Sequence, residues 1–264
     1  MTAVAILKLV HREAFELDTR VATLLPELRG WADEVTIRHL LQHTAGLPDY
    51  YAHYDEARRP PTNADALALL ARWKRLDFAP GTRHDYSNAG YDVLAAVIAR
   101  VSRVSFTAFM QREIFGPLGM RQTFAFDEDK RRRQGAARGY RRDGKDWELD
   151  DDSPLNQIHG SGSIYSSVDD LARYDAALFG RRLLPEKVLA EAFRPTRLAS
   201  GDRVPYGLGW NIGDGEVSHD GAWMGFASYY LHREDGLSVI VLSNDADAEV
   251  QEIAEAIADG ADAR

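Results

Sequence analysis

The chain opens with a stretch that has almost no polar face. Residues 2–10 read TAVAILKLV, and Lys8 is the only charged residue among them. A helix on the surface of a globular protein has an apolar stripe on one side and polar residues on the other. A segment that is apolar on nearly every side is typical of a buried helix. It is too short to cross a bilayer, so the sequence predicts a central core helix and no membrane span.

The middle of the chain is predicted to be mostly helical. Thr36 favours an N-cap for a helix over 37–43, which Gly46 would end. Helical periodicity continues over 63–75, 90–103, 106–114 and 168–179. Between the last two of these, Asp143-Gly144 is typical of a hairpin turn.

The last quarter of the chain has the pattern of a sheet. The runs 204–212, 216–232 and 236–243 predict three antiparallel strands joined by Gly and Asp turns, and a helix over 248–258 closes the chain. The fold class is therefore α+β, an antiparallel sheet flanked by helices together with a mostly helical lobe. We expect one domain over 1–264, with 1–20 and about 200–264 in the sheet lobe and about 21–199 in the helical lobe.

The charge and the residue types exclude several classes of function. The net charge of −9 and the pI of about 5.4 argue against a protein that binds nucleic acid, because such domains are basic. The basic run 130–133 is interpreted as solvated surface. The chain has no cysteine, which excludes a thiolate nucleophile, a disulfide and cysteine-ligated zinc.

Two histidines have the spacing of zinc ligands, but their context argues against a metal. His39 and His43 are four residues apart and would share one face of a helix. Leu40 follows His39 where a zinc-hydrolase helix has Glu, and no third ligand is evident. His43 is therefore interpreted as a structural residue at a helix end, and we expect neither a metal nor a cofactor.

Two short motifs contain residue types that can act in catalysis or in ligand binding. The segment PGTRHDYSNAGYDVL holds Tyr86 and Asn88 on a tight corner before a helix, and SHDGAWMGF holds His219 and Gly221 on a strand. Taken singly, each motif has a plainer interpretation. Tyr86 would pack its ring while Asn88 caps the helix, and His219 would be a strand histidine beside a turn.

Taken together, the motifs resemble a known family. In order and spacing, VTIRHLLQHTAGLPDY, the Tyr86 motif, GSGSIYSSVDDLARY and HDGAWMGFASYY resemble the class C β-lactamases and penicillin-binding proteins, a family that also holds serine esterases and D-amino-acid peptidases. The resemblance implies a β-lactamase/transpeptidase-like fold. It also implies catalytic roles for Tyr86 and Asn88, which match Tyr-x-Asn, and substrate binding by His219 and Gly221, which match His-x-Gly.

The nucleophile motif of that family is missing. Family members have Ser-x-x-Lys-x-(Phe/Met)-Thr-Ala at the start of the buried helix, which would put Lys about two residues and Ser about five residues before Met1. No lysine of the chain has Ser or Thr three residues before it, and no Gly-x-Ser-x-Gly occurs. Ser161 and Ser163 are interpreted as turn residues. We therefore expect the chain as given to be an inactive, N-terminally truncated member, with Tyr86 a neutral phenol.

Two interpretations remain open. The chain is either a hydrolase of esters, amides or β-lactams whose first residues lie upstream, or a non-catalytic relative that acts as a binding or scaffold module. The presence of all four motif residues favours the hydrolase. True β-lactamases have Lys at the position of His219, so a mostly neutral histidine favours esters or peptides.

The sequence also bears on the compartment and the assembly of the protein. The chain as given has no basic leader with a cleavage site; family members are often exported, and the sequence leaves the compartment open. Residues 237–242 are apolar without alternation, which predicts a strand buried on both faces. In the family its neighbours are strands that precede the serine helix. We therefore expect an unpaired edge and self-association through it.

Overall fold

A computed structural model describes residues 1–48, 50–51, 59–127 and 135–262. The basic run 130–133 lies outside the described residues, so its interpretation as solvated surface stays a prediction. The division into a sheet lobe and a helical lobe also stays a prediction.

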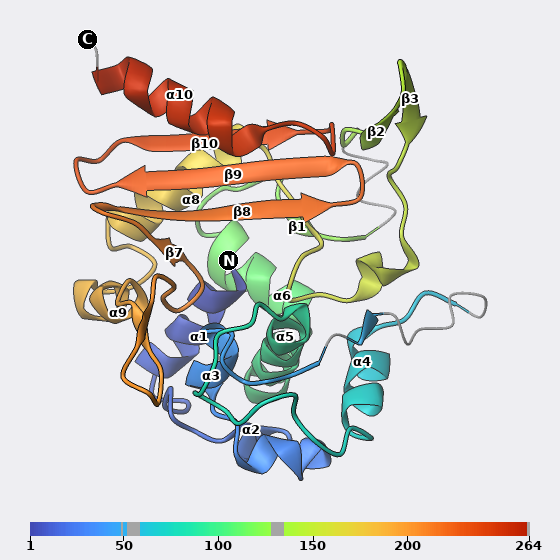
Figure 1. Cartoon of the computed structure of the whole chain (residues 1–264), viewed down its shortest axis with the longest axis vertical. Coiled ribbons are helices and arrows are strands. Elements are labelled where there is room, and N and C mark those ends of the chain that lie inside the picture. The colour runs from blue at the N-terminus through green and yellow to red at the C-terminus, as the bar shows by residue number, and fades with distance from the viewer. Residues whose placement is uncertain (49, 52–58, 128–134, 263–264) are drawn as a thin grey trace.

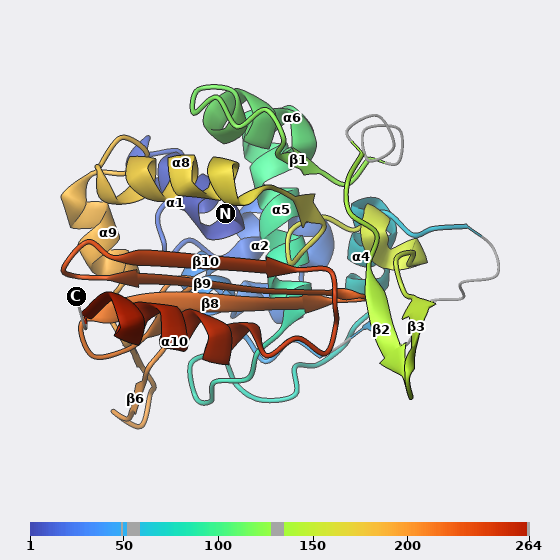
Figure 2. The same cartoon turned by 90° about the horizontal axis from the view of Figure 1, so that it is seen from above.

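The largest sheet has four antiparallel strands in the order β10-β9-β8-β7. These strands are Ser238–Ser243, Phe226–Arg233, Glu216–Trp223 and Asn211–Ile212. Helix α10 (Val250–Asp262) covers one face of the sheet, and helix α8 (Val168–Phe179) lies against the other (Figures 1 and 2). We call these the outer face and the inner face. The α+β prediction is confirmed.

The number of strands was predicted wrongly. The run 216–232 forms two strands, β8 and β9, joined by a tight turn at Met224-Gly225. Trp223 pairs with Phe226 across this turn, and Met224 has a left-handed φ of 50°. Methionine is not a typical residue for that backbone region, so an unbroken apolar run hid the turn.

The opening segment forms the predicted core helix. Helix α1 (Thr2–His11) buries Val4, Ala5 and Ile6 completely. It packs against helix α5 (Asn88–Ser102), which in turn contacts α3 (Ile37–Leu41) and α4 (Asn63–Leu70). All of these helices lie on the inner side of the sheet (Figure 1).

Several helix ends differ from the prediction. Thr36 caps α3 as predicted, but α3 ends at Leu41, well before Gly46, and α4 ends at Leu70. Helix α6 (Phe106–Met110) continues as a π-helical turn over Gln111–Phe115. The closing helix begins at Val250 and extends to Asp262, whereas α8 has the predicted bounds.

The remaining elements are short. They are the helices α2 (Val21–Leu24) and α9 (Glu186–Ala192), the 3-10 turns Pro26–Leu28, Trp31–Asp33 and Pro154–Gln157, and two small antiparallel pairs, β1 (Phe124–Ala125) with β4 (Ile164–Tyr165) and β5 (Thr196–Arg197) with β6 (Arg203–Val204).

The predicted hairpin projects from the body of the molecule (Figure 1). Strands β2 (Tyr140–Asp143) and β3 (Asp146–Leu149) are joined by Gly144 and Lys145, one residue later than the predicted turn. The base of the hairpin contacts the β8–β9 turn backbone to backbone. A Cβ on Gly225 would lie 2.2 Å from the carbonyl carbon of Gly139, so this contact requires glycine.

Strand β10 lies at one end of the strand order. Among the described strands of this sheet it pairs only with β9, which agrees with the predicted unpaired edge. Its faces are covered less completely than predicted, because Leu242 is 39% exposed.

Within the described ranges, no individual helix combines the length and the apolar character needed to span a membrane. Helix α5 and the segment Phe106–Phe115 meet that test only as a pair, and they are bent by 75° relative to each other.

Candidate active site

The Tyr-x-Asn motif lies on the loop that leads into α5. Ser87 is the N-cap residue and Asn88 is the first helical residue, so the interpretation of Asn88 as a cap is wrong. The side chain of Asn88 is exposed, and that of Tyr86 is 53% exposed. No described residue forms a hydrogen bond with the Tyr86 hydroxyl. Both side chains are therefore available to a ligand.

The His-x-Gly motif lies on β8, on the inner face. His219 is directly opposite Tyr230, whose hydroxyl reaches Asp175 of α8 at 2.6 Å. The ring centroids of His219 and Tyr86 are 6.2 Å apart, so the fold brings the two motifs together. Gly221 is two residues further along the same face, where a Cβ would lie 2.6 Å from the Oγ of Ser228.

His43 is buried against Tyr86 and is linked to His219 through Tyr206. It is 2% exposed, and its ring is stacked between Tyr86 at 4.0 Å and Tyr91 at 4.9 Å. Its backbone adopts a left-handed φ of 52°, which is uncommon outside glycine. The amide of Ser87 donates to Nδ1 of His43 at 3.1 Å. In the neutral ring the proton is therefore on Nε2, which faces the Tyr206 hydroxyl at 3.1 Å.

Tyr206 extends this hydrogen-bond chain to His219. Nδ1 of His219 donates to the carbonyl oxygen of Asp220 at 2.6 Å, which leaves Nε2 as an acceptor in the neutral ring. The Tyr206 hydroxyl lies 3.2 Å from that Nε2. His43 thus donates to Tyr206, and Tyr206 donates to His219. We call His43, Tyr86, Tyr91, Tyr206 and His219 the His219 cluster.

The cluster is electrically neutral at pH 7. Burial, reinforced by His84 and His219, lowers the pKa of His43 to about 3. Burial also lowers the pKa of His219. Although half of its side chain is exposed, neighbouring rings shield the phenol of Tyr86 and raise its pKa to about 12, with Asp220 acting in the same direction. Tyr86 is a neutral phenol, as predicted.

The first turn of α1 adjoins this cluster. Thr2 donates through Oγ1 to the carbonyl of Gly160 at 2.7 Å, and a Cβ on Gly209 would lie 2.7 Å from both the Ala3 Cβ and the Tyr91 hydroxyl. The amino group of Met1 is close enough to His219 to lower its pKa. The beginning of α1 therefore lies beside Tyr91 and His219 of the cluster.

A second polar group is centred on Asp92, one helical turn after Asn88 in α5. The carboxyl of Asp92 is 1% exposed and accepts hydrogen bonds from Tyr50 at 2.6 Å, Tyr51 at 3.2 Å and the Ser161 hydroxyl at 2.7 Å. Burial raises the pKa of Asp92 to about 6 despite these donors. Ser161, interpreted from the sequence as a turn residue, is held against helix α5 by this carboxyl.

The two histidines with zinc-ligand spacing do not share a helix face. His39 lies in α3, where its Nδ1 accepts from the Thr36 amide at 3.3 Å, whereas His43 lies beyond the helix end. In the part of the chain that the structure describes, no group of three or more His, Cys, Asp or Glu side chains is arranged to hold a metal.

The sequence motifs include Tyr86 and His219 of the cluster, but no motif predicted that Tyr206 and Tyr91 belong to it. Tyr206 was assigned to a strand and Tyr91 to an ordinary helix, and no spacing rule connects either residue with His43. A possible signal is the number of aromatic and histidine side chains near glycine in HTAGL, HDYSNAGY and PYGLGW.

Comparisons with known proteins match nearly the whole chain. The family model described as Beta-lactamase matches residues 1–262. Penicillin-binding protein 4* of Bacillus subtilis is 32% identical over 92% of this chain and 58% of its own length, and a D-aminopeptidase of Cereibacter sphaeroides is 29% identical over 86% and 45%. The chain thus spans about half the length of these curated relatives.

A solved structure shares the fold. The octameric penicillin-binding protein homologue from Pyrococcus abyssi superimposes with a TM-score of 0.82 at 28% identity, covering 96% of this chain and 61% of that one. The β-lactamase/transpeptidase-like fold expected from the resemblance is confirmed.

Proposed function

This chain belongs to the beta-lactamase family, a family of serine hydrolases, and from that premise we propose that it is the catalytic part of an enzyme that hydrolyses an ester, amide or β-lactam bond through an acyl-serine. The proposal includes a Ser-x-x-Lys turn immediately before Met1. The position of the first turn of α1 supports it, because this turn lies beside Tyr91 and His219 of the cluster and a preceding turn would be continuous with it.

The proposed roles follow from the chemistry of the cluster. Tyr86 would act as general base and then general acid toward the serine, once the upstream lysine lowers its pKa. Asn88 would hydrogen-bond the substrate or the lysine. The neutral Nε2 of His219 and the backbone beside Gly221 would bind the substrate at the edge of β8. The chain of His43 and Tyr206 would hold the His219 ring in one tautomer.

The test begins with the nucleotide sequence upstream of the Met1 codon. The chain that starts at Met1 and a chain extended by the upstream residues are incubated with a fluorescent penicillin and a fluorophosphonate. We expect labelling of one serine in the extended chain only. Labelling of a serine within the 264 residues contradicts the proposal. Absence of an in-frame Ser-x-x-Lys favours the non-catalytic binding module instead.

The identity of His219 suggests the substrate preference. A fixed positive charge at this position would attract a substrate carboxylate, whereas burial keeps His219 neutral. We therefore expect the extended enzyme to prefer short aryl esters to cephalosporins, measured as kcat/KM for p-nitrophenyl butyrate and nitrocefin. A clear preference for nitrocefin would contradict this assignment, as would an unchanged ratio of ester to lactam activity in His219→Lys.

We also propose self-association through the edge of β10. The observation in its favour is that β10 pairs with one strand only among the described residues, and open strand edges pair readily with other chains. Light scattering over a concentration series, with amide exchange at residues 239–241, tests this proposal. A stable monomer whose β10 amides all exchange slowly would refute it.

A further inference from the structure

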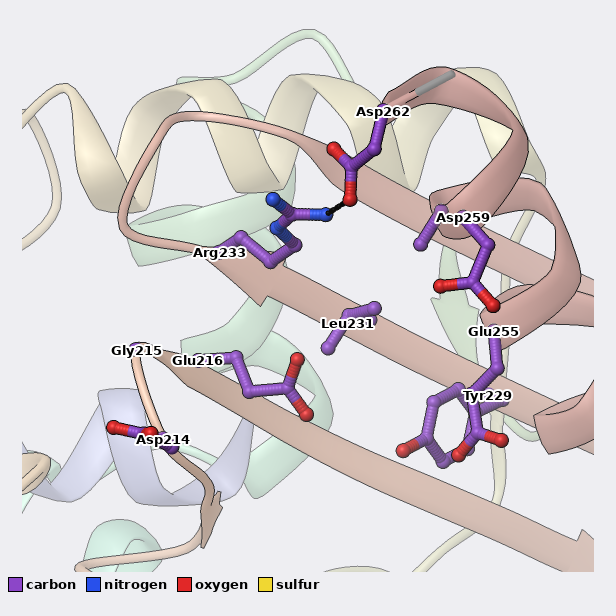
Figure 3. A pocket seen from close by; sticks show the side chains of 10 residues that line it. Asp214, Gly215, Glu216, Tyr229, Leu231, Arg233, Glu255, Asp259 and Asp262 are labelled. Atoms are coloured by element: carbon purple, nitrogen blue, oxygen red, sulfur yellow. Dashed lines mark hydrogen bonds and ion pairs between the residues drawn. The ribbon is translucent and has the colours of Figure 1, made fainter.

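A pocket lies on the outer face of the sheet, away from the His219 cluster. It occupies about 270 Å³ between α10, the strands β8 and β9, and the turn before β8. Figure 3 shows the side chains around it. Its wall contains five carboxylates, those of Asp214, Glu216, Glu255, Asp259 and Asp262, and one guanidinium, that of Arg233.

The alternation of side chains along the strands separates this pocket from the cluster. His219 and Tyr230 are paired on the inner face. Pairs an odd number of residues away along the strands are therefore on the outer face, among them Glu216 with Arg233 and Asp220 with Tyr229. Tyr229 belongs with Leu231 and Ala258 to the small apolar core beneath α10. The pocket therefore has an apolar floor and an acidic rim.

The single guanidinium does not neutralise the pocket. Arg233 is already paired with Asp262 at 2.7 Å and with Asp235 at 2.7 Å. Among the described residues, no ion pair involves any of the other four carboxylates, those of Asp214, Glu216, Glu255 and Asp259. The lining of the pocket therefore carries more acidic than basic side chains, and a bound cation would be stabilised here.

A buried phenol points to a ligand independently of the charges. Tyr229 is only 6% exposed, yet its hydroxyl forms no hydrogen bond with any described residue. Figure 3 shows this hydroxyl directed into the pocket, between Glu216 on β8 and the α10 side chains Glu255 and Asp259. The hydroxyl is therefore accessible from the pocket and available to accept a hydrogen bond from an ammonium group of a ligand.

The size and lining of the pocket favour an organic cation over a bare metal ion. The carboxylates are spread around about 270 Å³, and no three of the described acidic or histidine side chains converge as metal ligands. The tyrosine ring, Leu231 and Ala258 suit methylene groups, and the separated carboxylates suit more than one ammonium group.

We propose that this pocket binds an aliphatic polyamine. Its ammonium groups would pair with Glu216, Glu255 and Asp259, one of them would donate a hydrogen bond to the Tyr229 hydroxyl, and its methylene chain would pack on the Tyr229 ring. The site is separate from the hydrolase chemistry, so it does not depend on the presence of the nucleophile.

The test is calorimetric titration of the 264-residue chain with spermidine at low ionic strength. We expect one saturable site, with binding that weakens as salt screens the charges. Butylamine, with one ammonium group, should bind more weakly. Glu216→Gln and Asp259→Asn should each weaken spermidine binding about tenfold, and Tyr229→Phe about three- to tenfold, as expected for losing a charged or neutral partner of an ammonium.

The matched control is Glu34→Gln, which removes an exposed carboxylate that does not line the pocket. It should leave the affinity unchanged. Circular dichroism of each variant shows whether it has folded. Absence of spermidine binding at about 1 mM overturns the proposal. So does binding that all three pocket variants leave unchanged, and so does Mg²⁺ binding that displaces spermidine at equal concentration.

Discussion

The inner and outer faces of the sheet are built from the same strands but carry opposite kinds of polar group. On β8, His219 faces inward and belongs to a neutral cluster in which hydrogen bonds fix the rings of His43, Tyr206 and His219. Three residues earlier, Glu216 faces outward into a pocket with an excess of negative charge. Burial makes charge costly on the inner face, whereas the acidic side chains of the outer pocket lie at its solvent-accessible rim.

The difference shows how one strand pair can support two unrelated tasks. A neutral, hydrogen-bonded array fixes the direction of a few atoms, which suits bond-making chemistry. A ring of like charges fixes no atom strongly but attracts a cation from a distance. Variants that affect one face and leave the other unchanged test this separation.

The largest effect is expected at Tyr86. In the extended enzyme, Tyr86→Phe should lower kcat by about 10² to 10⁴, the usual range for general acid–base catalysis. The matched control is Tyr174→Phe, which removes a buried hydroxyl that has no hydrogen-bond partner among the described residues. That variant should change kcat less than about threefold. A change below threefold for Tyr86→Phe would remove this residue from the mechanism.

The second effect concerns one helix on each side of the sheet, α1 on the inner side and α10 on the outer side (Figure 1). Leu7 of α1 is 1% exposed, so Leu7→Ala should lower the free energy of unfolding by about 2–5 kcal/mol through lost burial and a cavity. Ile257 of α10 is 51% exposed, and Ile257→Ala should change it by less than about 0.5 kcal/mol. Urea denaturation measures both. Equal losses would show that α10 contributes as much to the core as α1.

The third effect is a pH dependence specific to the inner face. The pKa of His43 is about 3 in the folded chain and near 6.5 when unfolded, so only the unfolded chain binds this proton between those values. Its contribution to stability is complete above about pH 6.5 and is lost as the pH falls, by at most about 1.4 kcal/mol per pH unit.

Replacing His43 should remove that dependence. Denaturation of His43→Gln at several pH values should show a shallower loss of stability below pH 6.5 than the parent chain. His11→Gln, at an exposed histidine, serves as the control and should keep the parental slope. An unchanged slope in His43→Gln would mean that this ring is protonated in the folded state.

The smallest effect is expected on the outer face. Asp259→Asn removes one of four carboxylates that lack a cationic partner, so it should stabilise the ligand-free chain by up to about 0.5 kcal/mol at low salt. The gain should disappear at high salt because the repulsion is screened. Thermal unfolding at two salt concentrations measures it. A loss of stability would show that Asp259 has a favourable contact in the folded chain.

The sequence predicted features that repeat within one element and missed those that depend on packing between elements. The burial of α1 and the bounds of α8 follow from the spacing of apolar residues. The motifs located Tyr86 and His219, but Tyr206 joins them only because the loop before β7 returns to α3. The turn at Met224 was missed for a different reason, since its residues are not those that favour left-handed backbone.

The outer pocket could not be predicted from the sequence, because its position depends on helical spacing, strand register and helix packing together. Glu255, Asp259 and Asp262 follow helical spacing on one side of α10, a pattern that is visible in the sequence. Their approach to Glu216 depends on the register of β8 against β9 and on the face that α10 covers. Neither can be derived from spacing within a single segment.

The contact between Gly139 and Gly225 has a consequence for how this chain can change during evolution. Because two backbones meet there without side chains between them, substitution at either position forces the other backbone to move. The tip of the hairpin has no such contact: a Cβ on Gly144 would meet no atom within 4 Å, and the restriction there is the left-handed φ of 61°. Insertions and new binding specificities should therefore accumulate at the hairpin tip, while its base keeps the same length and the same two glycines.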